Sequence, residues 1–273
     1  MTDHKNGETI NDVLAQVAYQ MKETMDTMHA ALQRIAPSDA RDASRELDEN
    51  AALLMRNFYR LRRLSGNLEE AANLDAPALA PQQNDDIIGL CAAVTERAQD
   101  AARMLGLTLA FTAERDSYII ALDAVRIERL VLNLLSNAYK FTPRGGKVTV
   151  DVRVSPRQVE LRVSDNGCGI SADKLEDLFE RYKSMNFPDG TPRGMGLGLP
   201  ICRKIAQDHG GSLVVFSTEG EGTTVIATLE NRKAAKVTMN TWIAGDYAGG
   251  FNRTLLELAD ALPRQAFENK LMD

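Results

Sequence analysis

The sequence has few of the residues that build disulfide scaffolds and metal sites. Its three cysteines, Cys91, Cys168 and Cys202, are far apart in the 273-residue chain, and each lies beside apolar or glycine neighbours. Disulfide frameworks and zinc sites need closely spaced or paired cysteines, so this pattern predicts reduced thiols. We therefore expect a protein of a reducing compartment, with a cytoplasmic location.

Long apolar runs and an excess of positive charge are also missing. No run approaches the roughly 20 apolar residues of a membrane-spanning helix, and the N-terminal residues lack the apolar core of a signal peptide. We therefore expect no membrane span. The net charge of −6 gives no electrostatic basis for binding nucleic acid. The hydrophobic content of 44% is that of a soluble globular protein, and the length allows two domains.

Two amphipathic segments are present near the start of the chain. The first begins near Ile10 and ends before Pro37, and the second runs from about Asp42 to about residue 70. A hairpin of two such helices cannot cover its own apolar seams, so we predict a homodimer that forms a four-helix bundle. The predicted seams consist of Ile10, Leu14, Val17, Met21, Met28, Leu32 and Ile35, followed by Leu47, Ala51, Leu54, Phe58, Leu61, Ser65 and Leu68.

Polar side chains line one side of a later predicted helix. Asn133 and Asn137 are four residues apart and Lys140 follows three residues later, so all three extend along one side of the helix. Amide oxygens suit a hydrated Mg²⁺, and an ammonium neutralises phosphate charge. Two solvated asparagines on an ordinary helix would give the same pattern.

A second polar motif, DNGCGI at 165–170, follows a strand of alternating apolar residues. Asp165 lies at the end of that strand, and its carboxylate can accept a hydrogen bond from an exocyclic amine such as that of adenine. Gly167 and Gly169 allow a tight turn and a close approach of the backbone to a ligand. An ordinary turn of the Asp-Asn-Gly type explains this motif equally well when it is taken alone.

A glycine-rich segment, GMGLGL at 194–199, precedes a further apolar helix. Glycines before a helix N-terminus present free backbone N–H groups to phosphate. Such a loop is weak evidence by itself. Its value comes from its position, because it follows the first two motifs and a third one, LFERY at 178–182, in one fixed order.

The four motifs together resemble the ATP-binding domain of the GHKL superfamily, and within it the sensor histidine kinases of bacterial two-component systems. They correspond to the N, G1, F and G2 boxes, and AQDHGGSL (206–213) and GEGTTVIATL (220–229) extend the resemblance over about residues 10 to 230. It implies ATP and Mg²⁺ as cofactors, with Mg²⁺ held by Asn137. The implied ATP-binding residues are Asn133, Asn137, Lys140, Asp165, Gly167, Gly169, Phe179, Gly194, Gly196, Leu197, Gly198 and Thr223.

The resemblance also implies an α+β fold in three parts. Residues 1–75 would form the helical hairpin of a dimeric four-helix bundle, residues 76–232 a GHKL α/β sandwich, and residues 233–273 a C-terminal extension. Residues 180–193 would be the ATP lid, with Arg181, Lys183 and Arg193 as candidate cations for phosphate. The sequence predicts the remaining elements as helices over 87–104 and 254–262, strands over 107–111 and 118–122, a helix capped by Asp123, and a hairpin over 147–154 and 158–164.

The phosphoacceptor histidine of the family is missing from its usual position. Tyr19 stands where the family has the histidine, Gln20 where it has an acidic residue, and Thr24 where it has a proline. Tyr19 lies about 200° around the helix from Val17, so we expect it to face outward. His29 lies about 15 Å further along the same helix and lacks an acidic neighbour, which makes it a poor substitute.

Of the remaining histidines, His4 lies in the N-terminal residues that we expect to be frayed, and His209 is expected to have a structural role. The tail from residue 233 holds the only tryptophan, Trp242, and extends beyond the family pattern. Its apolar residues suggest docking on the body of the protein or on a partner, and we expect a packing extension without a role in chemistry.

These features favour an ATP-binding signalling protein with a degenerate acceptor site, which acts as an impaired kinase or as a nucleotide-dependent dimeric scaffold. A tyrosine hydroxyl with a pKa of about 10 is a poor replacement for imidazole. The alternative is an active histidine kinase that uses another acceptor and passes phosphate to a response regulator. A GHKL protein of another branch, such as an ATPase or an anti-sigma serine kinase, is disfavoured by the helical hairpin.

Overall fold

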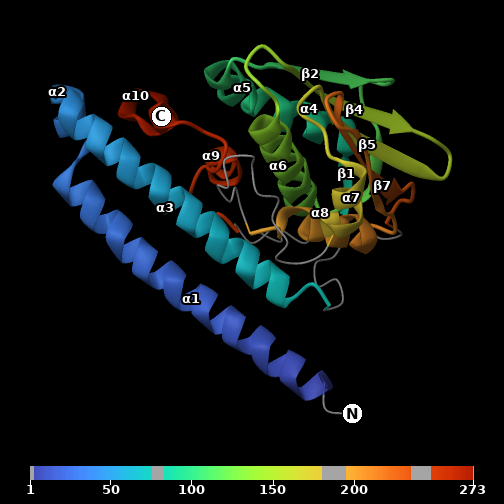
Figure 1. Ribbon diagram of the computed structural model, residues 1–273, viewed down its shortest axis with the longest axis horizontal. Coiled ribbons are helices and arrows are strands. Elements are labelled where there is room, and N and C mark those ends of the chain that lie inside the picture. Colours follow the sequence, from blue (N-terminus) through green and yellow to red (C-terminus); the bar gives the residue numbers. More distant parts are fainter. Residues whose placement is uncertain (1–2, 76–82, 180–194, 235–246, 273) are drawn as a thin grey trace.

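The computed structural model describes residues 3–75, 83–179, 195–234 and 247–272 (Figure 1). An N-terminal helical hairpin lies beside an α/β domain, and the C-terminal helices return to the hairpin. Several residues singled out in the sequence lie outside the described residues, namely Arg181, Lys183, Arg193, Gly194 and Trp242.

The hairpin consists of two long antiparallel helices, α1 (Asp3–Ile35) and α3 (Arg45–Ala72), joined by the short helix α2 (Ser38–Ala43). The Ser44 side chain accepts a hydrogen bond from the N–H of Leu47 and so caps the start of α3. The predicted pair of helices is confirmed, and α1 starts earlier than the predicted residue 10.

The predicted apolar seams of the hairpin are divided between two faces. Ala18, Met25 and Phe58 are buried within the chain, and Leu14, Met21 and Leu32 are partly buried against them. Among the predicted seam residues, Ala51, Ser65 and Leu68 are also buried, whereas Val17, Met28, Ile35, Leu54 and Leu61 are exposed. The hairpin thus buries one apolar stripe in this chain and leaves a second one uncovered. The exposed apolar residues of the two long helices are Val13, Val17, Met28, Ile35, Leu53, Leu54 and Leu61, together with Tyr19.

The α/β domain contains a five-stranded mixed sheet of order β2-β4-β5-β7-β6. β2 is parallel to β4, and the other neighbours are antiparallel. The predicted hairpin is confirmed, because β4 and β5 pair from Val148 opposite Asp165 to Val154 opposite Val159. The strands are β2 (Thr108–Ala113), β4 (Lys147–Val154), β5 (Gln158–Asp165), β6 (Leu213–Thr218) and β7 (Gly222–Glu230), and β1 (Gln83–Asp86) pairs separately with β3 (Ile119–Leu122).

The helices of the domain cover one face of the sheet (Figure 1). Strand alternation brings Val148, Val150 and Val152 into the core that these helices complete. Residues 87–104 form two helices rather than the predicted one, with the break at Ala98. The helices are α4 (Ile87–Arg97), α5 (Gln99–Leu105), α6 (Ala124–Phe141), α7 (Ala172–Leu175) and α8 (Gly198–Asp208). The 3₁₀ helix η1 (Glu176–Phe179) lies between α7 and α8.

Helix α6 is fixed at its start by two polar contacts. The Asp123 side chain accepts hydrogen bonds from the N–H groups of Val125 and Arg126, as the predicted cap requires. His209 follows α8, and its Nε2 accepts from the Asp123 N–H while Nδ1 lies 2.7 Å from the Ile205 carbonyl oxygen. Burial lowers the pKa of His209. The neutral imidazole therefore ties the start of α6 to the end of α8, in the structural role expected for it.

The C-terminal segment packs between the hairpin and the α/β domain. It contains α9 (Arg253–Leu258), the 3₁₀ helix η2 (Arg264–Phe267) and α10 (Asn269–Met272), and α9 is shorter than the predicted 254–262. Figure 1 shows these elements beside α3. Phe251 contacts the rings of His29, Phe58 and Tyr59 at centroid distances of 4.9, 5.1 and 5.8 Å. Residues 247–272 of the tail therefore pack on the body of the protein.

Among the described residues, no helix combines the length and the apolar character that a membrane span requires.

Candidate functional site

A cavity of about 290 Å³ lies between α6, the turn after β5 and the start of α8. α6, β5 and the turn after it supply Leu134, Asn137, Ala138, Lys140, Phe141, Val163, Asp165, Cys168, Gly169, Ile170 and Ser171. The remaining lining residues come from α3, from α7 to α8, from β6 and β7, and from the tail; they are Arg63, Asn67, Lys174, Leu178, Met195, Gly196, Leu197, Gly198, Leu199, Val215, Glu219, Thr223, Val225 and Asp260.

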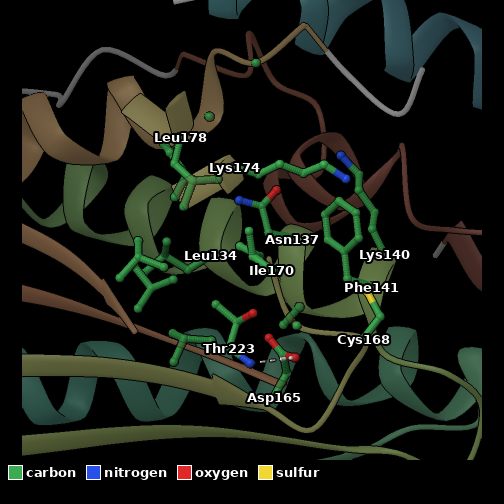
Figure 2. Close-up of a pocket in the computed structure, with 18 of the residues that line it drawn as sticks. Leu134, Asn137, Lys140, Phe141, Asp165, Cys168, Ile170, Lys174, Leu178 and Thr223 are labelled. Carbon is green, nitrogen blue, oxygen red and sulfur yellow. Dashed lines mark hydrogen bonds between the residues drawn. The ribbon is translucent and has the colours of Figure 1, made fainter. Parts of the chain in front are cut away.

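The cavity is polar at its two ends and apolar between them. Figure 2 shows Asp165 and Thr223 at the bottom and the side chains of Lys140 and Lys174 at the top. The middle is lined by Leu134 and Ile170 and by other aliphatic residues from the sheet and α8, and Leu178 lies above them on the left (Figure 2). Such a site suits an elongated ligand with a flat apolar body, a hydrogen-bond donor at one end and negative charge at the other.

Asp165 provides the acceptor at the bottom of the cavity. Its Oδ1 accepts hydrogen bonds from the N–H group of Gly167, at 2.9 Å, and from that of Thr223, at 3.3 Å, the second of which is drawn in Figure 2. Both backbone donors use Oδ1, so Oδ2 is the carboxylate oxygen left to accept from a ligand. Burial raises the pKa of Asp165, while the two backbone donors oppose this effect.

The backbone around Asp165 needs its glycines. Gly169 has a φ of +63°, and a Cβ on it would lie 2.0 Å from the carbonyl oxygen of Thr218. A Cβ on Gly167 would lie 2.4 Å from the carbonyl oxygen of Phe141. Gly169 lines the cavity itself, whereas Gly167 lies behind Asp165 and allows the turn to pack against the end of α6.

The other end of the cavity is built from α6, α3 and the tail. Asn137 and Lys140 come from α6, and Arg63 and Asn67 come from α3 of the helical hairpin. Lys140 is 9% exposed, and burial lowers its pKa to about 8. Its Nζ lies 3.3 Å from Oδ2 of Asp260.

Asp260 is the acidic residue that completes this end. Its Oδ2 accepts a hydrogen bond of 2.7 Å from Arg63, and its Oδ1 lies 3.3 Å from Nε of Arg60. Although burial opposes ionisation, the neighbouring cations Arg63, Lys140 and Arg60 lower the pKa of Asp260 to about 2. Three cations therefore surround the carboxylate of Asp260, and two of them, Arg63 and Lys140, line the cavity.

A second carboxylate of the tail, Glu257, lies in a fully buried network beside the cavity. Glu257 is 1% exposed, and its Oε2 accepts from Nε of Arg63 at 3.1 Å and from the amide of Asn133 at 3.3 Å. Its Oε1 lies 3.2 Å from Nε of Arg129. Arg63 also donates to Oδ1 of Asn133 at 3.0 Å. This cluster joins α3, α6 and α9 through charge-assisted hydrogen bonds.

The structure brings most of the residues expected at the site into one cavity. The lining includes Asn137, Lys140, Asp165, Gly169, Gly196, Leu197, Gly198 and Thr223. Asn133, Gly167 and Phe179 lie beside the cavity: Asn133 is 1% exposed in the Glu257 cluster, and the Phe179 ring packs under the guanidinium of Arg203 at 5.2 Å. Gly194 lies outside the described residues.

Tyr19 and Gln20 do not belong to the cavity. Both are exposed on α1, and Tyr19, whose side chain is 63% exposed, makes a long hydrogen bond of 3.4 Å to Glu23. Figure 1 shows α3 between α1 and the α/β domain. His29 lies against two aromatic rings, and burial lowers its pKa.

The sequence analysis missed Arg63, Asn67 and Asp260 at the polar end. Arg63 and Asp260 are 197 positions apart in the chain, and neither belongs to a motif. It also missed Cys168 and Lys174, although both follow Asp165 closely and the turn after a strand end was a visible signal.

A comparison with protein families matches residues 122–233 to "Histidine kinase-, DNA gyrase B-, and HSP90-like ATPase". This region includes α6, the turn after β5 and the start of α8, which form most of the cavity wall.

The curated relatives of the chain include sensor proteins and histidine kinases. The histidine protein kinase DivJ of Caulobacter vibrioides is 46% identical over 39% of this chain and 18% of its own length. An uncharacterized sensor-like histidine kinase of Rhizobium meliloti is 37% identical over 55% of this chain and 28% of its own. The sensor protein SrrB of Staphylococcus aureus is 27% identical over 83% of this chain and 39% of its own. The chain thus spans well under half the length of these relatives.

Solved structures of the same fold include full-length ShkA in complex with AMPPNP, which has a TM-score of 0.63 and 23% identity over 82% of this chain and 47% of its own. The catalytic domain of the histidine kinase ThkA gives a TM-score of 0.50 and 24% identity over 56% of this chain and 99% of its own. At these identities the likeness supports the fold.

The buried Glu257 cluster gives a prediction about stability. Glu257→Gln removes the negative charge between Arg63 and Arg129 at nearly constant shape, so we expect a loss of about 3 kcal/mol in the free energy of unfolding. Urea denaturation followed by circular dichroism measures it.

The matched control is Glu268→Gln in the same tail, where the partly exposed carboxylate lies 3.7 Å from Arg264. We expect this change to cost less than about 1 kcal/mol. Equal losses in the two variants would show that the buried cluster does not stabilise the junction.

Proposed function

Because the chain carries an ATPase domain of the histidine kinase type and is related to sensor histidine kinases, we propose that it is an ATP-binding signalling protein. The observation that carries the proposal is the cavity, which has a half-buried carboxylate at one end, aliphatic walls and an amide with cations at the other. That order matches the amine, the flat base and the charged phosphates of a nucleoside triphosphate.

The residues present fit ATP and Mg²⁺. Oδ2 of Asp165 accepts from the exocyclic amine of adenine, and the aliphatic walls enclose the base. Asn137 supplies an amide oxygen for Mg²⁺, and Lys140 supplies positive charge for the phosphates. Gly196 and Gly198 let the start of α8 approach the ligand closely. Bound ATP provides a transferable phosphoryl group, and the protein contributes positioning and charge.

The second part of the proposal is a homodimer formed by the hairpin. Each long helix carries an uncovered apolar stripe, with Val17, Met28 and Ile35 on α1 and Leu54 and Leu61 on α3. Contiguous exposed apolar surface of this kind favours association. A second copy that packs its hairpin on these stripes would complete a four-helix bundle.

The third part is a degenerate acceptor site. Tyr19 is exposed on α1, as a phosphoacceptor must be, but its phenol is a weak nucleophile and Gln20 cannot act as a base. His29 packs against the rings of Phe58 and Phe251 and is partly buried. We therefore propose a kinase with impaired or absent autophosphorylation, or a dimeric scaffold whose state depends on nucleotide. Its partner would be a response regulator or another signalling protein, as for ThkA, which was solved in complex with the response regulator TrrA.

ATP binding is tested by Asp165→Asn. The Asn oxygen can keep the bonds to Gly167 and Thr223, while its NH₂ group replaces Oδ2 and meets the amine of adenine donor to donor. We expect binding to weaken by about 1.5–3 kcal/mol, which corresponds to about 10- to 150-fold in Kd. Isothermal titration calorimetry with Mg-ATP measures the change.

The control for this experiment is Asp116→Asn, at an exposed position after β2. It should bind ATP as the wild type does. An Asp165→Asn variant with wild-type affinity would contradict the placement of adenine at Asp165.

The homodimer is tested at Leu54, which is 56% exposed in the single chain. Leu54→Lys would place a charge in the bundle interface, so we expect light scattering to fall from twice the chain mass of 30.0 kDa to a single chain mass. Phe58 is unsuitable for this purpose because it is buried within the chain against Phe251 and Tyr59. Glu114→Lys, at an exposed site after β2, is the control and should stay dimeric. A monomeric wild type at micromolar concentration would exclude the bundle.

The acceptor is tested with γ-labelled ATP, Mg²⁺ and an acid-stability assay. The wild type should show little or no acid-labile label, because phosphohistidine is acid-labile and the family position holds Tyr19. The double variant Tyr19→His, Gln20→Glu should exceed Tyr19→His alone, since base assistance is worth about 10²–10⁴ in rate. Strong acid-labile label on the wild type that disappears in His29→Ala would show instead an active kinase with His29 as the acceptor.

A further inference from the structure

The tail places a negative charge among the cations at the polar end of the cavity. Asp260 contacts Arg63, Lys140 and Arg60, of which Lys140 is a proposed phosphate ligand and Arg63 lines the same cavity. A fourth cation, Arg56, lies two turns before Arg63 on α3, and its buried Nε lacks a hydrogen-bond partner among the described residues. Asp260 therefore shares its single negative charge among three cations, of which Arg63 also binds Glu257.

We propose that Arg60, Arg63 and Lys140 form a binding site for the terminal phosphate of the nucleotide, and that Asp260 occupies this site as a tethered competitor. The inference rests on the proposed function, because it assigns the phosphate end of the same cavity. In this arrangement the helical hairpin contributes two arginines to the nucleotide site, and the tail must yield its place before the phosphate binds.

Two acidic residues of the tail, Glu257 and Asp260, have different roles, one as an anchor and the other as the competitor. Glu257 is 1% exposed and bonded within the buried cluster, so it holds α9 in place. Asp260 lies beyond the end of α9 at Leu258, and its side chain is 22% exposed. Asp260 can therefore move out of the cation cluster without the removal of Glu257 from its own site.

The difference in charge favours the terminal phosphate over the carboxylate of Asp260 at this site. One carboxylate carries a single negative charge and two acceptor oxygens, whereas a terminal phosphate carries more charge and three acceptor oxygens. The phosphate brings more negative charge to the positions that Asp260 contacts on the two arginines and the lysine, but the tethered carboxylate is always present at high local concentration. The tail thus lowers the apparent affinity for ATP, and any partner that draws the tail away raises it.

The test is the affinity of Asp260→Asn for ATP, measured by isothermal titration calorimetry against the wild type. Removal of the competing charge should tighten ATP binding about tenfold, within the usual range for coupled sites. Binding of AMP, which lacks the terminal phosphate, should stay unchanged. Asp260→Glu keeps the charge and should bind ATP as the wild type does, and so should the control Glu268→Gln on the same tail.

Three results would overturn the inference. If Asp260→Asn and the wild type bound ATP with equal affinity, ATP binding would stand but Asp260 would not compete with the phosphate. Weaker ATP binding by Asp260→Asn with Mg²⁺, but unchanged binding with EDTA, would make Asp260 a metal ligand instead. Absence of ATP binding in every variant would overturn the proposed function together with this inference.

A second measurement uses the wild type alone, in case the variant does not fold. Displacement of Asp260 by ATP should loosen the segment that follows it, so tryptic cleavage at Arg264 should become faster with Mg-ATP than with Mg-AMP. Equal or slower cleavage with Mg-ATP would contradict the displacement.

Discussion

The arrangement depends on one buried carboxylate, Glu257. Two arginines from different elements, Arg63 of α3 and Arg129 of α6, converge on it, and Asn133 completes the cluster. Buried cations need compensating charge, and removal of one member of such a group costs several kcal/mol. The tail therefore does more than cover apolar surface, because the charge of Glu257 holds the hairpin against the α/β domain.

This constraint explains why the cavity proposed to bind nucleotide includes residues from three parts of the chain. With α3 held against α6, the side chains of Arg63 and Asn67 extend the polar end that Asn137 and Lys140 begin. The same docking brings Asp260 to the phosphate end. Signals that move the hairpin or the tail would thereby change the charge at the cavity, which is a physical route from the helices to nucleotide affinity.

The sequence was informative where one local pattern decides the structure. Helical periodicity predicted the long hairpin, strand alternation predicted the pairing of β4 with β5, and the motif from Asp165 to Gly169 predicted one end of the cavity. It was less informative where partners come from distant segments. Asn133 shows the helical placement expected from its spacing, but its surroundings depend on Glu257, 124 positions later. The exposure of Val17 and Leu54 likewise depends on which face the second helix covers.

The account links nucleotide at the cavity to release of the tail, and hydrogen–deuterium exchange with and without Mg-ATP measures both ends of that link. It predicts slower exchange at residues 165–170 and 196–199, where the ligand binds, together with faster exchange across residues 258–268. Slower or unchanged exchange in residues 258–268 while the cavity becomes protected would contradict it.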